Sequence, residues 1–429
     1  MRIGANAARA VPGSGVLLCA VAAALTVVPA LAEGGGQEQP RVEGEYGLVV
    51  TRDSGRITVR WLTGEPAAGY LEARSGERLL HRDTTPSGAG HLVRFADPGS
   101  GHVRLRYGAA DGDSLHETTL RLGEGSGAGR RETVFGARDS LWVVGDVHGH
   151  YDRLRRLLAN AGLVDAGGRW TGGHSHLVLL GDLMDRGPHV TRTLWFVYRL
   201  QAEAREAGGR VSVVLGNHEI MVLTGDHRYV PSRERLLATR YGITYGEMYH
   251  PRRSLLGEWL TRQPAAIRVG DVLLAHGGIG PAYLDMSVPE LNDSLTTYVS
   301  EDLFEYWSDT TVQITPRDSA VVMRRVQFLF EGPSVFWYRD YARTDSAGET
   351  LRELLRRRDA RLHVIAHTPV PTIRHSYGDS VVLADLERPA TEMLLLVREG
   401  EDYQRWVYGM EGAPRRLGGA DSTSPGTRR

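Results

Sequence analysis

The sequence has a single cysteine and no lysine, and this scarcity limits the kinds of cross-link, nucleophile and basic side chain that the protein can use. The single cysteine, Cys19, stands near the amino terminus, so the rest of the chain can have neither a disulfide framework nor a thiolate nucleophile or thiolate metal site. Lysine is absent, so every basic side chain is an arginine. The formal net charge is only -1, and no overall field of one sign favours a nucleic acid or an acidic surface. Any charged partner must therefore be recognised locally.

Long apolar runs are also scarce, and the main one lies at the amino terminus. The stretch VLLCAVAAALTVVPALA follows Arg2 and Arg9 and ends in the small-x-small pattern of a signal peptidase site. We therefore predict a signal peptide over residues 1–32, cleavage after Ala32, and export to the periplasm or the exterior. The run is shorter than the ~20 residues of a membrane span, so we expect no stable membrane anchor. An uncleaved anchor is the alternative.

Residues 44–123 show short segments in which apolar residues alternate with polar ones, separated by Gly, Pro, Asp and Ser. This period of two predicts a small antiparallel β-sandwich. Its stretch VRWLTGEPAAGYLEA resembles the opening strands of the fibronectin type III-like modules that precede the catalytic domains of purple acid phosphatases. We expect a spacer or docking role whose partner the sequence does not indicate. Linkers are predicted over residues 33–43 and 124–132.

From residue 133 onwards, apolar runs alternate with helix-like stretches, which predicts a layered α/β domain over residues 133–410 and a disordered tail over 411–429. Five runs place Asp, Asn or His directly behind an apolar strand: VVGDVHGH, LLGDLMDRG, VVLGNHE, LLAHGG and VIAHT. The loops at that edge of such folds converge on ligands. One such residue is more often a helix cap or a satisfied core group, but five that supply only oxygen and imidazole predict a shared site.

These motifs, in this order and spacing, resemble the phosphoprotein phosphatase branch of the calcineurin-like metallophosphoesterases over roughly residues 140–385. The segments NHEIMVLTGDHRYV and GPSVFWYRDY are most similar to the Shewanella-like protein phosphatases. The resemblance implies a layered sandwich of two β-sheets flanked by helices, here preceded by the all-β domain. In one departure, Ile220 and Met221 replace the Ser-Arg that usually follows Asn-His-Glu in the eukaryotic serine/threonine enzymes. One phosphate-contacting arginine is thereby lost.

The resemblance also implies the ligands of two metal ions per chain. Asp182 would bridge the two ions, and the remaining ligands would be Asp146 and His148 for the first ion and Asn217, His276 and His367 for the second. Oxygen and nitrogen ligands without sulfur suit Mn, Fe or Zn. Two cations that share a carboxylate can also share a hydroxide, which would attack phosphorus in line.

The same resemblance implies which side chains handle the phosphate. His218 would protonate the leaving oxygen, and Asp185 would orient it. Arg186 would grip phosphate oxygens with its planar fork, and Arg339 is a second candidate for that role. The alternative for Arg339 is a surface salt bridge with Asp340.

Together these features predict an exported binuclear-metal phosphomonoesterase, a protein phosphatase with the phosphotyrosine preference that the Shewanella-like resemblance implies. The apolar step Ile220–Met221 is expected to suit an aromatic ring near the site. Two alternatives stay open: a hydrolase of small phosphate esters or diadenosine polyphosphates, and a non-catalytic binding protein on the same fold. The expected partner is a phosphorylated protein or a small phosphoester, and not a nucleic acid.

Overall fold

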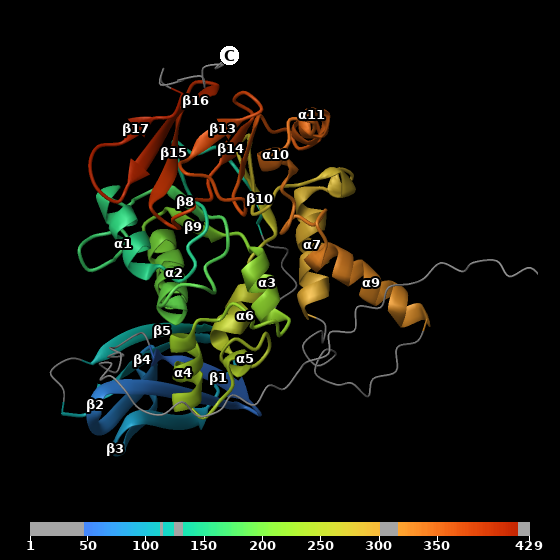
Figure 1. The fold of residues 1–429 in the computed structure, drawn as a ribbon. Helices are drawn as coiled ribbons and strands as arrows, with labels where there is room; N and C mark the ends of the chain where they lie inside the picture. Colours follow the sequence, from blue (N-terminus) through green and yellow to red (C-terminus); the bar gives the residue numbers. More distant parts are fainter. Residues whose placement is uncertain (1–46, 112–114, 124–131, 301–315, 419–429) are drawn as a thin grey trace, which may run out of the picture. The chain divides into compact units, whose positions relative to one another are not determined.

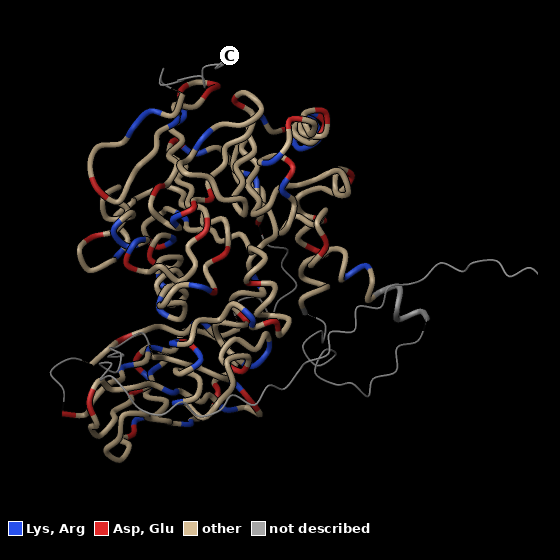
Figure 2. Tube along the Cα trace, viewed as in Figure 1, with Lys and Arg blue, Asp and Glu red and all other residues tan. Residues whose placement is uncertain are grey.

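The part of the chain that the structure describes belongs to one unit, Val42–Arg429 (Figure 1). The computed structural model describes residues 47–111, 115–123, 132–300 and 316–418. The predicted signal peptide, the first linker and residues 124–131 of the second lie outside these ranges. Among the described helices, none combines the length and the apolar character that crossing a membrane requires. Acidic and basic residues are interspersed along the described chain, in line with its near-zero net charge (Figure 2).

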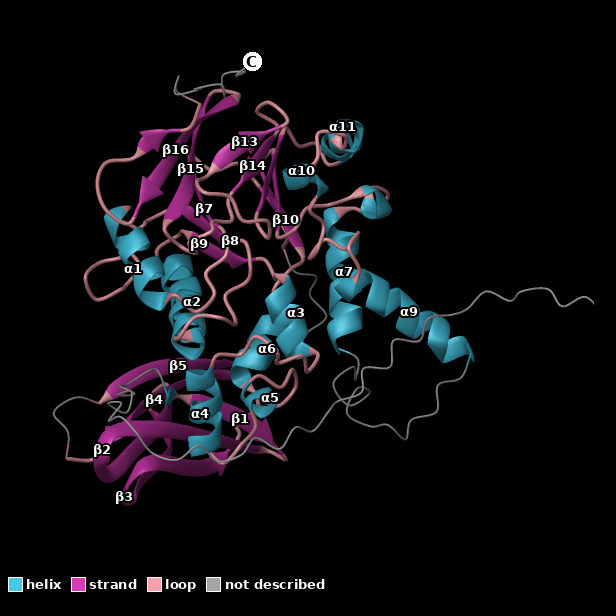
Figure 3. Ribbon diagram, viewed as in Figure 1, coloured by secondary structure: helices cyan, strands magenta, loops and turns pink. Residues whose placement is uncertain are grey.

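Residues 134–416 contain two six-stranded sheets (Figure 3). The first, named here the β11 sheet, has the order β13-β14-β12-β11-β10-β6. Its strands are β6 (Val134–Phe135), β10 (Ala266–Val269), β11 (Val272–Ala275), β12 (Leu362–Ile365), β13 (Arg374–Ser376) and β14 (Val381–Leu383). The second, the β7 sheet, has the order β17-β16-β15-β7-β8-β9. Its strands are β7 (Ser140–Val144), β8 (His176–Leu179), β9 (Arg210–Val213), β15 (Glu392–Glu399), β16 (Asp402–Gly409) and β17 (Arg415–Arg416).

Within each sheet, the strands that carry the polar motifs run parallel to one another. In the β7 sheet, β8 pairs in parallel with both β7 and β9, and in the β11 sheet β11 pairs in parallel with β12. Every residue of β8, β11 and β12 is buried, as expected of parallel strands covered on both faces. All five apolar runs singled out in the sequence are therefore confirmed as strands.

Helices flank the two sheets (Figure 1). In the β7 sheet α1 contacts β16 and α2 contacts β9, and in the β11 sheet α7 contacts β10. In α2, Leu194, Val197 and Leu200 recur at helical spacing on the buried side. The helices are α1 (Tyr151–Asn160), α2 (Val190–Glu206), α3 (Asn217–Leu223), α4 (Ser232–Arg240), α5 (Tyr245–Met248), α6 (Leu255–Thr261), the 3-10 helix η2 (Pro281–Tyr283), α7 (Val288–Ser300), α9 (Pro316–Phe330), α10 (Asp340–Arg343) and α11 (Gly348–Arg357). The predicted mixed α/β fold is confirmed.

The amino-terminal strands form one five-stranded antiparallel sheet. They are β1 (Val49–Asp53), β2 (Arg56–Ser75), β3 (Arg78–Ala96), β4 (Gly101–Ala109) and β5 (His116–Leu122). The pairing of β2 with β3 shifts register between Leu62 and Ala67, so one long hairpin replaces several predicted short strands. The all-β character agrees with the sequence, but these strands belong to one hydrogen-bonded sheet and do not confirm a fibronectin III-like sandwich.

This amino-terminal sheet packs directly on helix α2. The indole Nε1 of Trp195 donates a hydrogen bond to the carbonyl of Leu48 over 2.8 Å, and the backbone N–H of Arg121 donates to the hydroxyl of Tyr198, also over 2.8 Å. The guanidinium of Arg121 stacks on the same tyrosine ring, 4.1 Å from its centroid. The sheet therefore shares buried polar contacts with the α/β part of the chain.

At the carboxyl end, the structure differs from the predicted disordered tail over residues 411–429. Residues 411–418 are described, and within them β17 pairs with β16 through Arg415 and Arg416. The composition of this segment is polar, and backbone pairing to an existing strand edge orders it without an apolar core of its own.

Candidate metal centre

The carboxyl ends of strands from both sheets deliver the predicted ligands to one place. Asp146 follows β7, Asp182 follows β8, and Asn217 follows β9, while His276 and His367 follow β11 and β12. The sixth predicted ligand, His148, comes two residues after Asp146. All six side chains are buried. Two groups of closely spaced potential ligand atoms occur among the described residues, namely His148, Asp182 and His218, and Asp182, His276 and His367.

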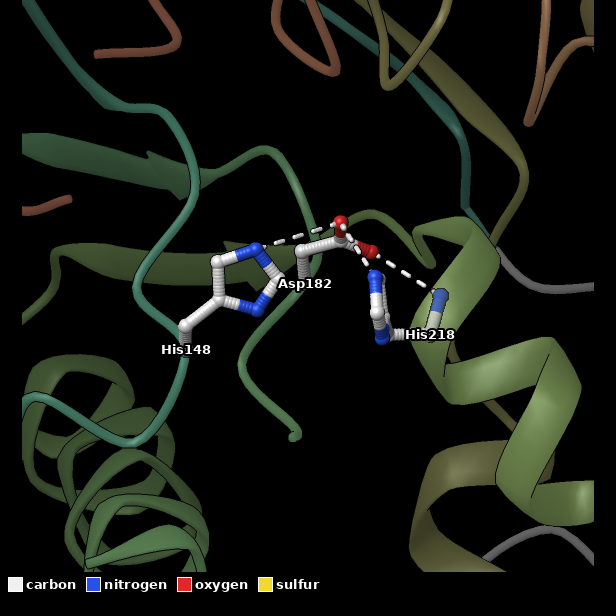
Figure 4. A group of neighbouring side chains, drawn as sticks. All are labelled: His148, Asp182 and His218. Carbon is white, nitrogen blue, oxygen red and sulfur yellow. Dashed lines mark hydrogen bonds and ion pairs between the residues drawn. The ribbon is translucent and has the colours of Figure 1, made fainter. Parts of the chain in front are cut away.

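Asp182 belongs to both groups, and its two carboxylate oxygens face different neighbours (Figure 4). Its Oδ2 lies 3.7 Å from Nε2 of His148, whereas its Oδ1 lies 3.4 Å from Nε2 of His276 and accepts a 3.0 Å hydrogen bond from the backbone N–H of His218. A β-carbon on Gly216 would lie 2.2 Å from that Oδ1, so only glycine leaves room for the carboxylate. This is the arrangement that a carboxylate bridging two cations requires.

His148 directs a ring nitrogen with a free lone pair toward Oδ2 of Asp182. Its Nδ1 donates a 2.9 Å hydrogen bond to the carbonyl of Met184, which fixes the proton on that nitrogen because a carbonyl can only accept. Its Nε2 is buried without a hydrogen-bond partner among the described residues, 3.5 Å from Oδ2 of Asp146. The pairing of Asp146 with His148 predicted for the first metal is therefore present in the structure.

His276 lies near Oδ1 of Asp182 and, like His148, uses its Nδ1 for a backbone hydrogen bond. Its Nδ1 donates a 2.7 Å hydrogen bond to the carbonyl of Leu180. Burial lowers the pKa of His276, which favours the neutral ring with its lone pair on Nε2. That nitrogen nevertheless faces Oδ1 of Asn217 at 3.0 Å and Nδ1 of His367 at 3.2 Å. Atoms that are all electron donors converge here, and a cation is the group that would satisfy them together.

Three buried carboxyl groups lie in the same region and can supply negative charge to a cation bound there. Burial and the neighbouring Asp182 raise the pKa of Asp146 well above its usual range. For Asp182 burial acts in the same direction, but the nearby imidazoles of His276 and His218 outweigh it and hold its pKa low. Burial and the charges of Asp146 and Asp182 raise the pKa of Asp385 to about 9. The side chains present thus fit divalent cations, which would neutralise this charge.

Asp385 is a buried carboxyl group at this edge that the sequence reasoning missed. It lies two residues after β14, which pairs in parallel with β12, so it obeys the rule that identified the other five motif residues. Its Oδ2 has no hydrogen-bond partner among the described residues. The signal was present in VVLADL, an acid behind an apolar strand, but without a motif around it.

The backbone at the site is strained in a way that supports function. Nine non-glycine residues in the described chain have positive φ angles, and five of them are predicted site residues. They are His148, Asp182, Asp185, Arg186 and His367. Such conformations are costly for residues with a side chain and persist where the surrounding structure enforces them. They direct the ligating side chains out of the strand ends and toward one another.

Glu219 explains how the loops behind β8 and β9 are held together. This fully buried residue of the GNHE motif was given no role from the sequence. Its Oε2 accepts hydrogen bonds from the backbone N–H groups of Asp182 and Gly216, both at 2.8 Å, and its Oε1 accepts one from Met184 at 3.0 Å. Burial raises the pKa of Glu219 to about 7, while the three N–H groups favour its ionised form. Glu219 therefore holds the loop that carries Asp182 against the loop that carries Gly216.

His218 and Asp185 adopt the predicted relationship. Nδ1 of His218 donates a 2.7 Å hydrogen bond to Oδ2 of Asp185, and both side chains are buried. Nε2 of His218 lies 3.0 Å from the guanidinium of Arg186, which can only donate, so this nitrogen carries no proton in the arrangement observed. By distance alone His218 could also bind a cation beside Asp182 (Figure 4). The guanidinium against its Nε2 disfavours that, because a metal ion there would meet a positive charge.

Arg339 lies beside the second predicted metal. Its guanidinium is half-buried and donates hydrogen bonds to the carbonyl of His367 at 2.7 Å and to the hydroxyl of Thr368 at 3.3 Å. Burial lowers its pKa, while the carboxylates of Asp385 and Asp146 act in the opposite direction. The side chain is thus directed to the site edge and not to a surface salt bridge.

The expectation that Ile220 and Met221 would contact an aromatic ring is wrong. Ile220 is fully buried and Met221 is 2% exposed, so neither side chain offers an accessible apolar surface to a ligand. The reason is that every residue of α3 is buried, and Ile220 belongs to the hydrophobic core. The aromatic ring that is accessible beside His218 belongs to Tyr229, farther along the same segment.

Comparison with known proteins matches this geometry. Residues 140–371, more than half of the chain, match the family model described as calcineurin-like phosphoesterase. The chain is 41% identical over 102 residues to Shewanella-like protein phosphatase 2 of Arabidopsis thaliana, covering 24% of this chain and 26% of that protein. It is 28% identical over 193 residues to Shewanella-like protein phosphatase 1 of Plasmodium berghei, covering 41% and 52%. The chain therefore spans between a quarter and about half of the length of these curated relatives.

Among solved structures, a cold-active protein-tyrosine phosphatase from a psychrophilic Shewanella species superposes with a TM-score of 0.65 at 26% identity, covering 87% of this chain and 99% of that one. The match extends over the region in which the strands of both sheets end in buried Asp, Asn and His. Family model, relatives and site geometry agree, and this chain belongs to the calcineurin-like phosphoesterases.

Proposed function

We propose that this chain is an exported, metal-dependent phosphomonoesterase that removes phosphate from phosphorylated tyrosine in proteins. The observation that carries the proposal is the meeting of six buried ligand side chains around Asp182, with the His218–Asp185 pair and Arg186 at their edge. A binding protein that only kept the fold would have no use for this number of costly buried polar groups. The name of the Shewanella structure, a protein-tyrosine phosphatase, supports the tyrosine preference.

The side chains divide the chemistry among them. When bound, two metal ions would supply positive charge for the phosphate and would lower the pKa of a water so that it can act as hydroxide. The oxygen and nitrogen donors present suit Mn, Fe or Zn. Asp185 holds the imidazole of His218 in one orientation, with Nε2 turned toward Arg186. Once Arg186 leaves that nitrogen to grip phosphate oxygens, Nε2 can hold the proton that the leaving oxygen needs.

The role of His218 is tested with leaving groups that differ in basicity. His218→Ala should slow phosphoserine hydrolysis most, by roughly 10²- to 10⁴-fold, because an alkoxide needs a proton in order to leave. The loss should be smaller for phosphotyrosine, whose phenol has a pKa of about 10, and smallest for nitrophenyl phosphate. His174→Ala, at an exposed histidine, is the matched control. An equal loss on all three substrates would exclude His218 as the proton donor.

The substrate class is tested on metal-analysed wild-type enzyme. A panel of phosphotyrosine and phosphoserine peptides, small phosphate esters and diadenosine tetraphosphate should show the highest kcat/KM for phosphotyrosine. A preference for the dinucleotide would favour the second hydrolase reading and leave the metal site intact. No turnover of any phosphoester by metal-loaded enzyme would favour the binding-protein reading.

Export is tested by the amino terminus of the mature protein. The proposal rests on the charged, apolar and small-residue order over residues 1–32. Protein recovered from outside the cytoplasm should begin at Glu33. A chain that keeps Met1 and sediments with membranes would show instead that the segment is an anchor.

A further inference from the structure

Tyr229 is a large aromatic residue that the structure leaves exposed beside the proposed proton donor. Its side chain is 46% exposed, whereas most aromatic residues of the described chain are buried or half-buried. The centroid of its ring lies 5.2 Å from that of His218, with the two rings inclined at 56°. The guanidinium carbon of Arg186 lies 5.8 Å from the same ring. The guanidinium carbon of Arg228 lies 5.9 Å from it as well. His218 and Arg186, two of the four side chains proposed to handle the phosphate, therefore border one partly exposed aromatic ring.

The backbone fixes Tyr229 in this position. Its carbonyl accepts a 3.0 Å hydrogen bond from the backbone N–H of Arg186, so the loop after α3 is tied to the loop after β8. The next residue, Val230, is buried and its carbonyl accepts a hydrogen bond from Nε of Arg235. The ring is thus held between a buried neighbour and a site loop, and little ordering is required of it when a ligand arrives.

The chemistry of the reaction places the leaving group on this side. A proton donor must lie within hydrogen-bond distance of the oxygen that departs, so the carbon attached to that oxygen must lie close to Nε2 of His218. In an aryl phosphate that carbon belongs to a ring. Rings attract one another in offset or edge-to-face contacts with centroids 4.5–7 Å apart. The Tyr229 ring lies 5.2 Å from the His218 ring, so a leaving-group ring beside Nε2 of His218 would come near it. A serine side chain offers no ring to this face.

We infer that the Tyr229 ring is the surface that recognises the leaving-group ring of an aryl phosphate and so selects phosphotyrosine over phosphoserine. This inference rests on the proposed function and names the residue that gives it its specificity. Tyr229 takes the place that the buried Ile220 and Met221 cannot fill. Because a contact between two rings does not involve the hydroxyl, the hydroxyl of Tyr229 is not required.

The kinetic experiment compares Tyr229→Ala with Tyr229→Phe, which keeps the ring. In Tyr229→Ala the ratio of kcat/KM for a phosphotyrosine peptide to that for the phosphoserine peptide of the same sequence should fall roughly 3- to 15-fold, the value of one aromatic contact. Tyr229→Phe should keep the ratio within about twofold. Leu236→Ala, at another exposed large apolar residue, controls for a general effect of truncation. Equal losses on both peptides would overturn the inference and make Tyr229 a positioning residue for His218.

A binding experiment separates this inference from the proposed function because it needs no turnover. Benzylphosphonate and ethylphosphonate resist hydrolysis and differ only in carrying a phenyl or a methyl group, and their affinity for metal-loaded enzyme is measured by calorimetry. Tyr229→Ala should weaken benzylphosphonate roughly 3- to 15-fold and ethylphosphonate less than about twofold. If the wild type bound both phosphonates equally, the inference would fail even in an active phosphatase. If the wild type preferred benzylphosphonate through Tyr229 yet hydrolysed nothing, the proposed function would fail and the ring-binding site would stand.

Discussion

Arg186 and His218 share a hydrogen bond that links two roles usually described separately. While the guanidinium donates to Nε2, the imidazole cannot carry a proton there, and the guanidinium has one fewer N–H for phosphate. A phosphate that draws Arg186 away therefore also exposes the nitrogen that must be protonated. In the proposed reaction, substrate binding and preparation of the acid would be coupled through this one pair of side chains.

Asp182 is the residue whose change should affect metal binding most. Asp182→Asn removes the charge that faces both His148 and His276, so affinity should fall by more than about tenfold at both metal positions. His148→Ala removes a donor from one side only and should mainly weaken the first position. Elemental analysis of purified variants distinguishes the two patterns. An Asp182→Asn protein with two metals per chain and normal activity would show that the bridge is assigned wrongly.

At the scale of elements, the hydrogen bonds of Glu219 at the start of α3 should affect both stability and metal content. Glu219→Gln replaces one acceptor oxygen by an amino group that meets backbone N–H donors, leaving at least one of them unsatisfied. The free energy of unfolding should fall by about 1–3 kcal/mol and the metal content should fall with it. Glu234→Gln, at a buried glutamate of α4 that binds Thr191, is the control and should lower stability alone. Unchanged metal content in Glu219→Gln would mean that these hydrogen bonds do not support the ligand loop.

Strand β12 carries a buried histidine that should make the fold sensitive to acid. His363 donates through Nδ1 to the carbonyl of Leu273 and accepts at Nε2 from the backbone N–H of Ile279, and burial lowers its pKa to about 4 from an ordinary 6.5. Between these pH values the unfolded chain binds a proton that the folded chain does not. Stability is therefore complete above pH 6.5 and should decline by about 1.4 kcal/mol per pH unit on the way down to pH 4.

The control for this prediction is His363→Gln, which keeps one donor and one acceptor but does not titrate. Urea unfolding of both proteins at pH 7, 6 and 5 should show a shallower loss of stability for the variant. Parallel curves for wild type and variant would mean that His363 is protonated in the folded state.

The elements show which parts of the molecule could be predicted. The five apolar runs and the polar residues behind them are local patterns, and parallel strands bring their carboxyl ends together, so the meeting of these polar side chains could be predicted from the sequence. Their roles as metal ligands are what the family resemblance implies. The roles of Tyr229 and Asp385 depend on where loops return in space, which no local pattern carries. The burial of Met221 depends on the direction in which α3 leaves its first residue. The long β2–β3 hairpin likewise depends on pairing, not on the alternation that each segment shows.

At the scale of the whole molecule, metal removal should weaken the fold. Without cations, three carboxyl groups are buried near one another, those of Asp146, Asp182 and Asp385. The pKa values of Asp146 and Asp385 are raised by burial and by the neighbouring carboxyls, whereas nearby imidazoles lower that of Asp182. Restoring metal at 100 times its Kd should stabilise the chain by about 2.7 kcal/mol per site. Calorimetry of chelated and reconstituted protein measures this as a rise in Tm. An identical Tm in both states would show that the folded chain does not bind the metal more tightly than the unfolded one.

A cation bound at Asp182 would join the two central sheets by more than packing. Asp182 belongs to a loop of the β7 sheet, whereas His276 and His367 belong to loops of the β11 sheet. A cation held by all three side chains would therefore link loops of the two sheets. When the metal is removed, the loops of the β7 sheet and of the β11 sheet lose this common restraint. Amide hydrogens behind β8 and behind β11 and β12 should then exchange faster together, although they are far apart in the chain.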